Sequence, residues 1–229
     1  WSQSERLGGG LLSPPSVSAM APRPPSPPHG AGCSALHAAA EAGDATAVAQ
    51  LLARGHGPAP RDAWGATPLH YAATRNRAGA TSALLRGGAD PGAEDEDGLR
   101  PAHWAAANGG VTVLERLLVA APGEVGAPAR GSGRTPLHCA CRTGQVVAAR
   151  VLAASGAALG APDAEGATPL HDAARAGCDA LAEFLVAEGA DPGARDALGR
   201  TPADVTQRAV LRRFLEERRK TAEAEAAAL

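Results

Sequence analysis

The chain has 229 residues and a formal net charge of −2, so it can bury a substantial core, and its charge favours neither nucleic acid nor anionic membranes. Aromatic residues make up only 3% of it, which leaves alanine and leucine to fill an interior and predicts closely packed helices. No apolar run reaches the roughly 18 residues of a transmembrane helix, and "GGGLLSPP" interrupts any signal-peptide core, so we expect neither.

The first segment, residues 1–32, carries seven prolines and five glycines and is predicted to be a disordered tail. The single methionine is Met20. We therefore expect that translation starts at Met20 and that residues 1–19 are an upstream extension.

From residue 33 onward one phrase returns at a fixed period. It reads "SALH" from Ser34, "TPLH" from Thr67, "RPAH" from Arg100, "TPLH" from Thr135, "TPLH" from Thr168 and "TPAD" from Thr201. The steps are 33, 33, 35, 33 and 33 residues, which is typical of stacked-repeat proteins. The two extra residues of the long step fall in the loop 119–134.

Each repeat reads as two helices and a turn-rich loop. Thr67 can cap a first helix that begins with Pro68, where the missing N–H costs nothing. A residue suited to the left-handed conformation then ends that helix, and it recurs at Gly43, Asn76, Gly109, Gly144 and Gly177. A second helix places Leu181, Phe184 and Leu185 at helical spacing. Gly, Pro and Asp residues in "EGADPGARDALG" predict the loop to the next repeat.

The T-P-L-H-x-A phrase and the GAD…DxxG connector resemble the ankyrin-repeat family over residues 33–217. The resemblance implies an all-α fold: an α-solenoid of about six helix-turn-helix units whose β-turn fingers project to one side. The units fall near residues 33–63, 64–96, 97–131, 132–164, 165–197 and 198–217, and residues 218–229 form a charged Ala/Glu-rich tail. The sixth unit departs from the pattern, with Asp204 in place of histidine and a shortened second helix, as expected of a terminal cap.

One stretch, "TPLHCACRTG", has residue types that occur in metal sites and catalytic sites, because it places His138 beside Cys139 and Cys141. The same histidine position recurs as His37, His70, His103, His138 and His171. Helices that stack about 8–10 Å apart cannot bring these imidazoles within the roughly 2 Å of one zinc ion that ligands need. We instead expect each imidazole to bond backbone and turn groups and to tie one repeat to the next.

The two cysteines occupy different repeat positions. Cys141 replaces alanine in the core, whereas Cys139 stands at a variable position that we expect to be exposed. A metal- or redox-linked function of Cys139 and Cys141 is the weakest of three functional hypotheses; the other two, a scaffold and an enzyme regulator, are given below. No nucleotide, hydrolase or metalloprotease motif is present, so we predict no enzyme activity and no cofactor.

The variable positions of a solenoid, at the finger tips and at first-helix positions that we expect to be exposed, are the candidate binding sites. Family resemblance places both on the concave side. The candidates are Trp64, Tyr71, Arg75, Glu94, Asp95, Glu96, Asp97, Trp104, Arg142, Asp172 and Arg175. Two structural alternatives remain open: the aromatic side chains pack between repeats, and the four acidic residues form a solvated turn.

The segment "RAVLRRFLEERRK" is predicted to be a capping helix with Val210, Leu211, Phe214 and Leu215 facing inward. Its arginines could also indicate a nuclear signal or nucleic-acid contact, but interleaved Glu216 and Glu217 favour a solvated cap.

The sequence therefore predicts a non-enzymatic scaffold or adaptor, a monomer that binds one or more proteins through its concave surface. The alternative is a regulator that occludes the active site of a partner enzyme. Nucleic acid, membrane and small-molecule substrates are not predicted as partners. Because the cysteines show no disulfide framework, we expect an intracellular location, cytoplasmic, nuclear or both.

Overall fold

The computed structural model describes residues 32–227, which form helices, turns and loops and contain no strand. The predicted tail and the proposed extension upstream of Met20 therefore lie outside the described residues, apart from Gly32. The helices are α1 (Ala35–Ala42), α2 (Ala45–Ala53), α3 (Pro68–Thr74), α4 (Ala78–Arg86), α5 (Pro101–Ala107), α6 (Val111–Ala120), the 3₁₀ helix η2 (Pro122–Val125), α7 (Pro136–Thr143), α8 (Val146–Ala154), α9 (Pro169–Ala176), α10 (Asp179–Ala187), α11 (Pro202–Val205) and α12 (Ala209–Ala227). The predicted all-α fold is confirmed.

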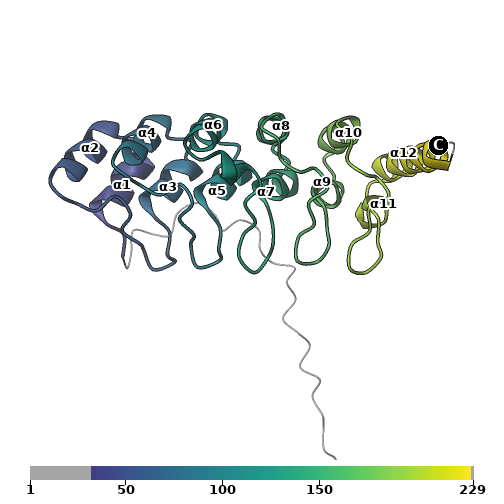
Figure 1. Ribbon diagram of the computed structural model, residues 1–229, viewed down its shortest axis with the longest axis horizontal. Coiled ribbons are helices and arrows are strands. Elements are labelled where there is room, and N and C mark those ends of the chain that lie inside the picture. The colour runs from purple at the N-terminus through teal and green to yellow at the C-terminus, as the bar shows by residue number, and fades with distance from the viewer. Residues whose placement is uncertain (1–31, 228–229) are drawn as a thin grey trace, which may run out of the picture.

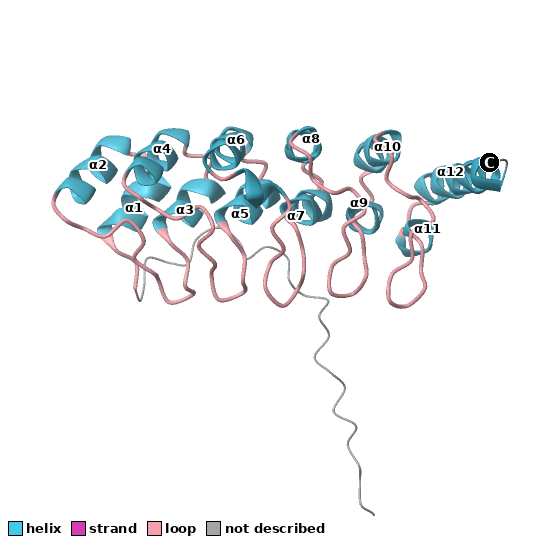
Figure 2. Ribbon diagram, viewed as in Figure 1, coloured by secondary structure: helices cyan, strands magenta, loops and turns pink. Residues whose placement is uncertain are grey.

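The helices form two layers of a solenoid (Figure 1). The odd-numbered helices, the first of each unit, lie side by side in an inner layer, and the even-numbered helices cover them as an outer layer. The connecting loops project beyond the inner layer as a row of fingers (Figure 2). The first helices contact their equivalents in the adjacent units, and the second helices from α2 to α10 do the same, while α12 packs on α11. The fold is therefore built from contacts between neighbouring elements.

The residues predicted to begin and end the first helices do so. Thr67, Thr135 and Thr168 are extended N-cap residues, and a proline follows each of them at the first helical position. The first helices end in left-handed backbone at the five predicted positions, including Asn76 with φ 53°. Asn76 is the only non-glycine with positive φ among the described residues, and its side-chain oxygen accepts from the Val113 N–H of the next unit.

Buried leucines in register form the core. Leu84, Leu117, Leu152 and Leu185 recur at one position of the second helices and are fully buried, and Leu69, Leu137 and Leu170 of the first helices face them. Alanines fill the narrow space between adjacent first helices, where a larger side chain would push these helices apart. The core is therefore one continuous apolar stack.

A buried aspartate shapes each of four fingers. Asp163, for example, accepts from the N–H groups of Glu165 and Ala167 through Oδ1 at 2.9 Å, and the same pattern occurs at Asp62, Asp95 and Asp196. Neighbouring fingers are joined by single backbone bonds, such as Ala197 N–H to the Glu165 carbonyl at 2.8 Å. Gly166 suits this turn because its φ is +73° and a Cβ there would lie 2.9 Å from the Ala197 nitrogen.

The cap differs from its prediction in two ways. Its second helix is not shortened: α12 spans 19 residues and continues through most of the predicted tail, whereas its first helix, α11, has only four residues. Val210 does not face inward, because its side chain is 75% exposed while Leu211 and Leu215 are buried. In the fifth unit, the Arg150 guanidinium of the fourth unit lies over Phe184, 5.0 Å from its ring centroid.

These burial differences predict unequal effects of two substitutions in α12. Leu215→Ala removes a fully buried side chain and should lower the free energy of unfolding by about 2–5 kcal/mol. Val210→Ala, the matched control, should change it by less than about 0.5 kcal/mol. Chemical denaturation measures both, and equal effects would contradict the inward face assigned to the cap.

Candidate functional site

Five imidazoles link each unit to the next. In each, Nδ1 accepts the backbone N–H of the N-cap residue three positions earlier at 3.1 Å, which fixes Nε2 as the protonated nitrogen. Nε2–H then donates to the carbonyl at the base of the following finger at 2.9–3.1 Å. The histidine–carbonyl pairs are His37–Ala66, His70–Leu99, His103–Arg134, His138–Ala167 and His171–Arg200. The predicted structural role is confirmed.

Burial favours the neutral form of four imidazoles, those of His37, His70, His103 and His138. Desolvation lowers the pKa of His70 and of His103 to about 4, and it also lowers the pKa of His37 and His138. Below about pH 6.5 the unfolded chain binds protons that folded His70 and His103 do not. The contribution of these residues to stability is therefore complete above that pH and is lost as the pH falls toward 4.

The cysteine hypothesis finds no support in the site's geometry. Cys139 is 2% exposed, so our expectation of an exposed thiol is wrong. Burial raises the pKa of Cys139 to about 11 and raises that of Cys141 as well, so both remain thiols at neutral pH. Residues 32–227 contain no cluster of three or more histidine, cysteine or acidic side chains that could hold a metal ion.

The aromatic candidates are mostly structural. Tyr71 is 5% exposed, and its hydroxyl donates to Asp62 Oδ2 at 2.8 Å. Half-buried Trp104 donates from Nε1 to Asp95 Oδ2 at 2.9 Å. Each ring also meets the histidine of the preceding unit edge to face, with centroids 5.2 Å apart for Tyr71 and 5.4 Å for Trp104. The expectation that these first-helix positions are exposed is wrong for Tyr71, and the open alternative of inter-repeat packing describes both rings.

The acidic finger is not uniformly solvated. Asp95 is buried and shapes the turn, while Glu94 bonds Arg100 at 3.3 Å and also pairs with Arg130. Burial alone would raise the pKa of Glu94, but these two guanidinium groups outweigh it and lower that pKa. Only Glu96 and Asp97 of the predicted block of four are exposed.

An ion pair links two departures from the repeat pattern, the arginine at position 100 and the two-residue insertion in the following loop. Arg100 stands where the other units have Ser or Thr, and its Nη1 donates to Glu124 Oε1 at 2.9 Å. Glu124 belongs to η2, the short helix formed in the loop that carries the two extra residues. Sequence reasoning missed this pair, although the arginine and the long step occur in the same unit.

Three of the remaining candidates, Arg75, Arg142 and Arg175, lie near the C-terminal ends of the inner helices. Arg75 bonds Glu41 of the first unit at 3.1 Å, and Arg175 bonds Asp172 at 2.8 Å. Asp172 itself is fully buried, so the expectation of its exposure is wrong. Desolvation raises the pKa of Asp172 to about 6 against the opposing charges of Arg134, Arg175 and Arg142. Arg75 and Arg175 are exposed, whereas Arg142 and finger residue Trp64 are half-buried.

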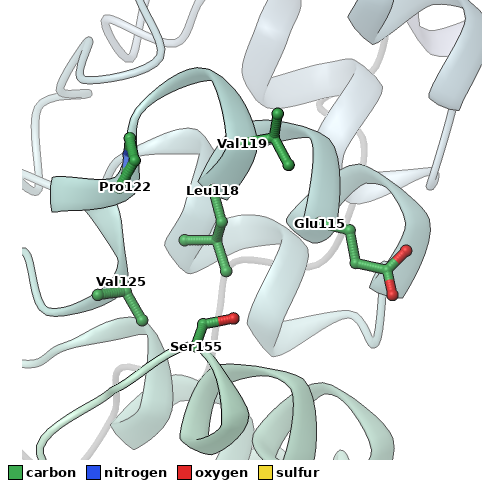
Figure 3. A pocket seen from close by; sticks show the side chains of 6 residues that line it. All are labelled: Glu115, Leu118, Val119, Pro122, Val125 and Ser155. Carbon is green, nitrogen blue, oxygen red and sulfur yellow. The ribbon is translucent and has the colours of Figure 1, made fainter.

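An apolar hollow of about 250 Å³ opens beside the outer helices (Figure 3). It is lined by Glu115, Leu118, Val119, Pro122, Val125 and Ser155, from α6, the η2 loop and the end of α8. None of the predicted site residues lies in it. No helix of the described chain is long and apolar enough to cross a bilayer.

These features define a repeat protein of the α-solenoid class. A family model described as "Ankyrin repeats (3 copies)" matches residues 19–95, 36–129 and 102–196, so the chain belongs to the ankyrin-repeat family. Ankyrin repeats generally mediate protein–protein interaction, and family members are typically non-enzymatic. Among curated proteins, none matches this chain significantly.

Among solved structures, the chain is similar to the ankyrin repeat domain of Bcl-3, described as "a unique member of the IkappaB protein family". The TM-score is 0.64 at 24% sequence identity, and the match covers 82% of this chain and 100% of that one. At this identity the similarity supports the shared fold alone.

The structural role of Tyr71 predicts a loss of stability without any partner present. Tyr71→Phe keeps the ring but leaves the buried Asp62 Oδ2 without this donor, which should cost about 1–3 kcal/mol. Thermal or chemical denaturation of the purified variant measures the loss. An unchanged stability combined with weaker partner binding would restore Tyr71 as a binding residue.

Proposed function

We propose that this ankyrin-repeat protein is a non-enzymatic scaffold or adaptor that binds a partner protein through its inner face. We define this face as the exposed ends of the first helices together with the finger tips. One observation carries the proposal. The histidines, cysteines and buried aspartates belong to the interior of the fold, whereas charged side chains at equivalent repeat positions remain exposed on this face. The exposed or half-buried candidates are Trp64, Arg75, Glu94, Glu96, Asp97, Trp104, Arg142 and Arg175.

The arrangement suits recognition of a macromolecule. The inner face extends along the row of units, so it offers a long surface to a partner (Figure 1). Its histidines, buried aspartates and aromatic rings hold that surface rigid through bonds between units. A rigid surface loses little conformational entropy when a partner binds.

A regulator that covers the active site of a partner enzyme is the second candidate, and the same face would serve it. We further propose that the protein acts as a monomer inside the cell, in the cytoplasm, the nucleus or both. A captured enzyme whose activity changes on binding would favour regulation over scaffolding.

The test compares two matched sets of alanine substitutions in an affinity capture read by mass spectrometry. The inner-face set replaces two arginines and two acids: Arg75, Glu96, Asp97 and Arg175. The outer-face control replaces the same kinds of exposed residue: Arg54, Arg86, Glu183 and Glu188. A partner should be captured by the parent and the control and lost, by about tenfold or more, from the inner-face variant.

Thermal melts must show that both variants are folded. Capture that survives the inner-face changes but is lost with the outer-face changes would contradict the proposal and place binding on the second helices.

A further inference from the structure

Two ion pairs near the C-terminal end of the solenoid have the same form. Arg175 bonds Asp172 at 2.8 Å, and Arg200 bonds Asp196 at the same distance. In both pairs the guanidinium side chain is partly exposed, at 39% and 45%, while the carboxylate side chain is buried, at 0% and 2% exposure. The two pairs therefore allow a matched comparison within one chain.

The carboxylate of Asp196 has donors at both oxygens. Oδ1 accepts the N–H groups of Leu198 and Arg200 at 3.0 and 2.9 Å, and Oδ2 accepts from the Arg200 side chain at 2.8 and 2.9 Å. Burial alone would raise the pKa of Asp196, but the bonds from Arg200 and the backbone outweigh it and lower that pKa. The fold therefore stabilises the ionised form of Asp196.

Asp172 lacks this support. Its Oδ1 accepts from Arg175 Nη1, whereas its buried Oδ2 makes no hydrogen bond within residues 32–227. A buried ionised oxygen without a donor has a high desolvation cost, and a bound proton removes the charge. Burial accordingly raises the pKa of Asp172 to about 6, although nearby arginines act in the opposite direction.

The repeat pattern explains why Asp172 has so few donors. The second and third units have Tyr71 and Trp104 at this position, and each ring donates to the second oxygen of the aspartate in its own finger. In the fifth unit that finger aspartate is Asp163, whose Oδ2 accepts instead from Arg134 Nε at 3.4 Å. The negative charge of Asp163 helps to raise the pKa of Asp172. The fifth unit thus has two carboxylates where earlier units pair one carboxylate with a donor.

The helices packed against α9 bring further charged or titratable groups. On α7 these are Arg142 and the neutral thiols of Cys139 and Cys141; on α10 and α11 they include Asp179 and Asp204. The charge of Arg142 favours the ionised form of Asp172. Asp179 pairs with an arginine of the cap, and Asp204 accepts from the N-cap residue of its own helix at 2.8 Å. His171, beside Asp172 in the sequence, has both ring nitrogens bonded.

We propose that Asp172 is a proton-controlled anchor for Arg175. The ionised carboxylate holds the guanidinium along α9. When Oδ2 binds a proton from solvent, the carboxyl group becomes neutral and the partly exposed guanidinium turns into water with its charge uncompensated. The inner face near the end of α9 then gains one positive charge. The inference goes beyond the proposed function, because it concerns this face whatever partner binds there.

Side-chain NMR of the ¹³C- and ¹⁵N-labelled full chain tests the anchor between pH 5 and pH 8. The carboxyl carbon of Asp172 should titrate with a midpoint at about pH 6, and the Nε–H signal of Arg175 should shift with the same midpoint. The Nε–H signal of Arg200 is the matched control. It should not shift over this range, because Asp196 stays ionised.

Asp172→Asn removes the titrating carboxyl group and leaves every histidine in place. In this variant the Arg175 signal should show no transition between pH 5 and pH 7. The proposal is overturned if Asp172 stays ionised down to pH 5, or if the Arg175 signal shifts equally in the parent and the variant.

Chemical denaturation of the same two proteins gives a second measurement. Folded Asp172 binds its proton near pH 6, whereas the unfolded chain binds it only near the usual aspartate pKa of about 4. The ionised form therefore lowers stability above pH 6, and this loss disappears as the pH falls toward 4. The denaturation midpoint of Asp172→Asn, relative to the parent, should be higher at pH 8 than at pH 5. A relative midpoint that is equal at the two pH values would contradict the anchor.

Discussion

The histidine bridge between units is the interaction on which the rest of the structure depends. One imidazole accepts from the helix cap of its own unit and donates to the finger base of the next, so it fixes both the start of a helix and the position of its neighbour. A buried ring with both nitrogens satisfied avoids the cost of an unpaired polar group. Repetition of this bridge five times sets the spacing at which leucines meet in the core and fingers meet through their backbones.

Much of this could be predicted from sequence because the determinants are local and periodic. The Thr-Pro start, the left-handed stop at Asn76 and the repeating leucine each act within one unit and recur in the next. The histidine bridge followed from the recurrence of one polar residue at a core position. Residues that recur with the repeat period are therefore the ones that build the fold.

The errors came from treating variable positions as surface. Tyr71 and Asp172 differ between units, yet both are buried, and the Tyr71 hydroxyl donates to Asp62 of the finger that precedes its helix. The aspartate of the DxxG phrase was visible, but its second oxygen, which accepts from Tyr71 or Trp104, depends on how the finger folds back. The Arg100–Glu124 pair and the outward Val210 likewise depend on contacts between segments that the period does not describe. Sequence variation therefore marks places where units differ, and only burial shows which of them can meet a partner.

The protonation state of the bridging histidines tests this account most directly. Nitrogen-detected NMR of the ¹⁵N-labelled chain should show neutral rings with the proton on Nε2, because Nδ1 accepts from the N-cap and Nε2 faces a carbonyl. His70 and His103 should remain neutral down to about pH 5, since burial lowers the pKa of both to about 4. Rings that carry the proton on Nδ1, or that become imidazolium near pH 6.5 in the folded chain, would contradict the bridge.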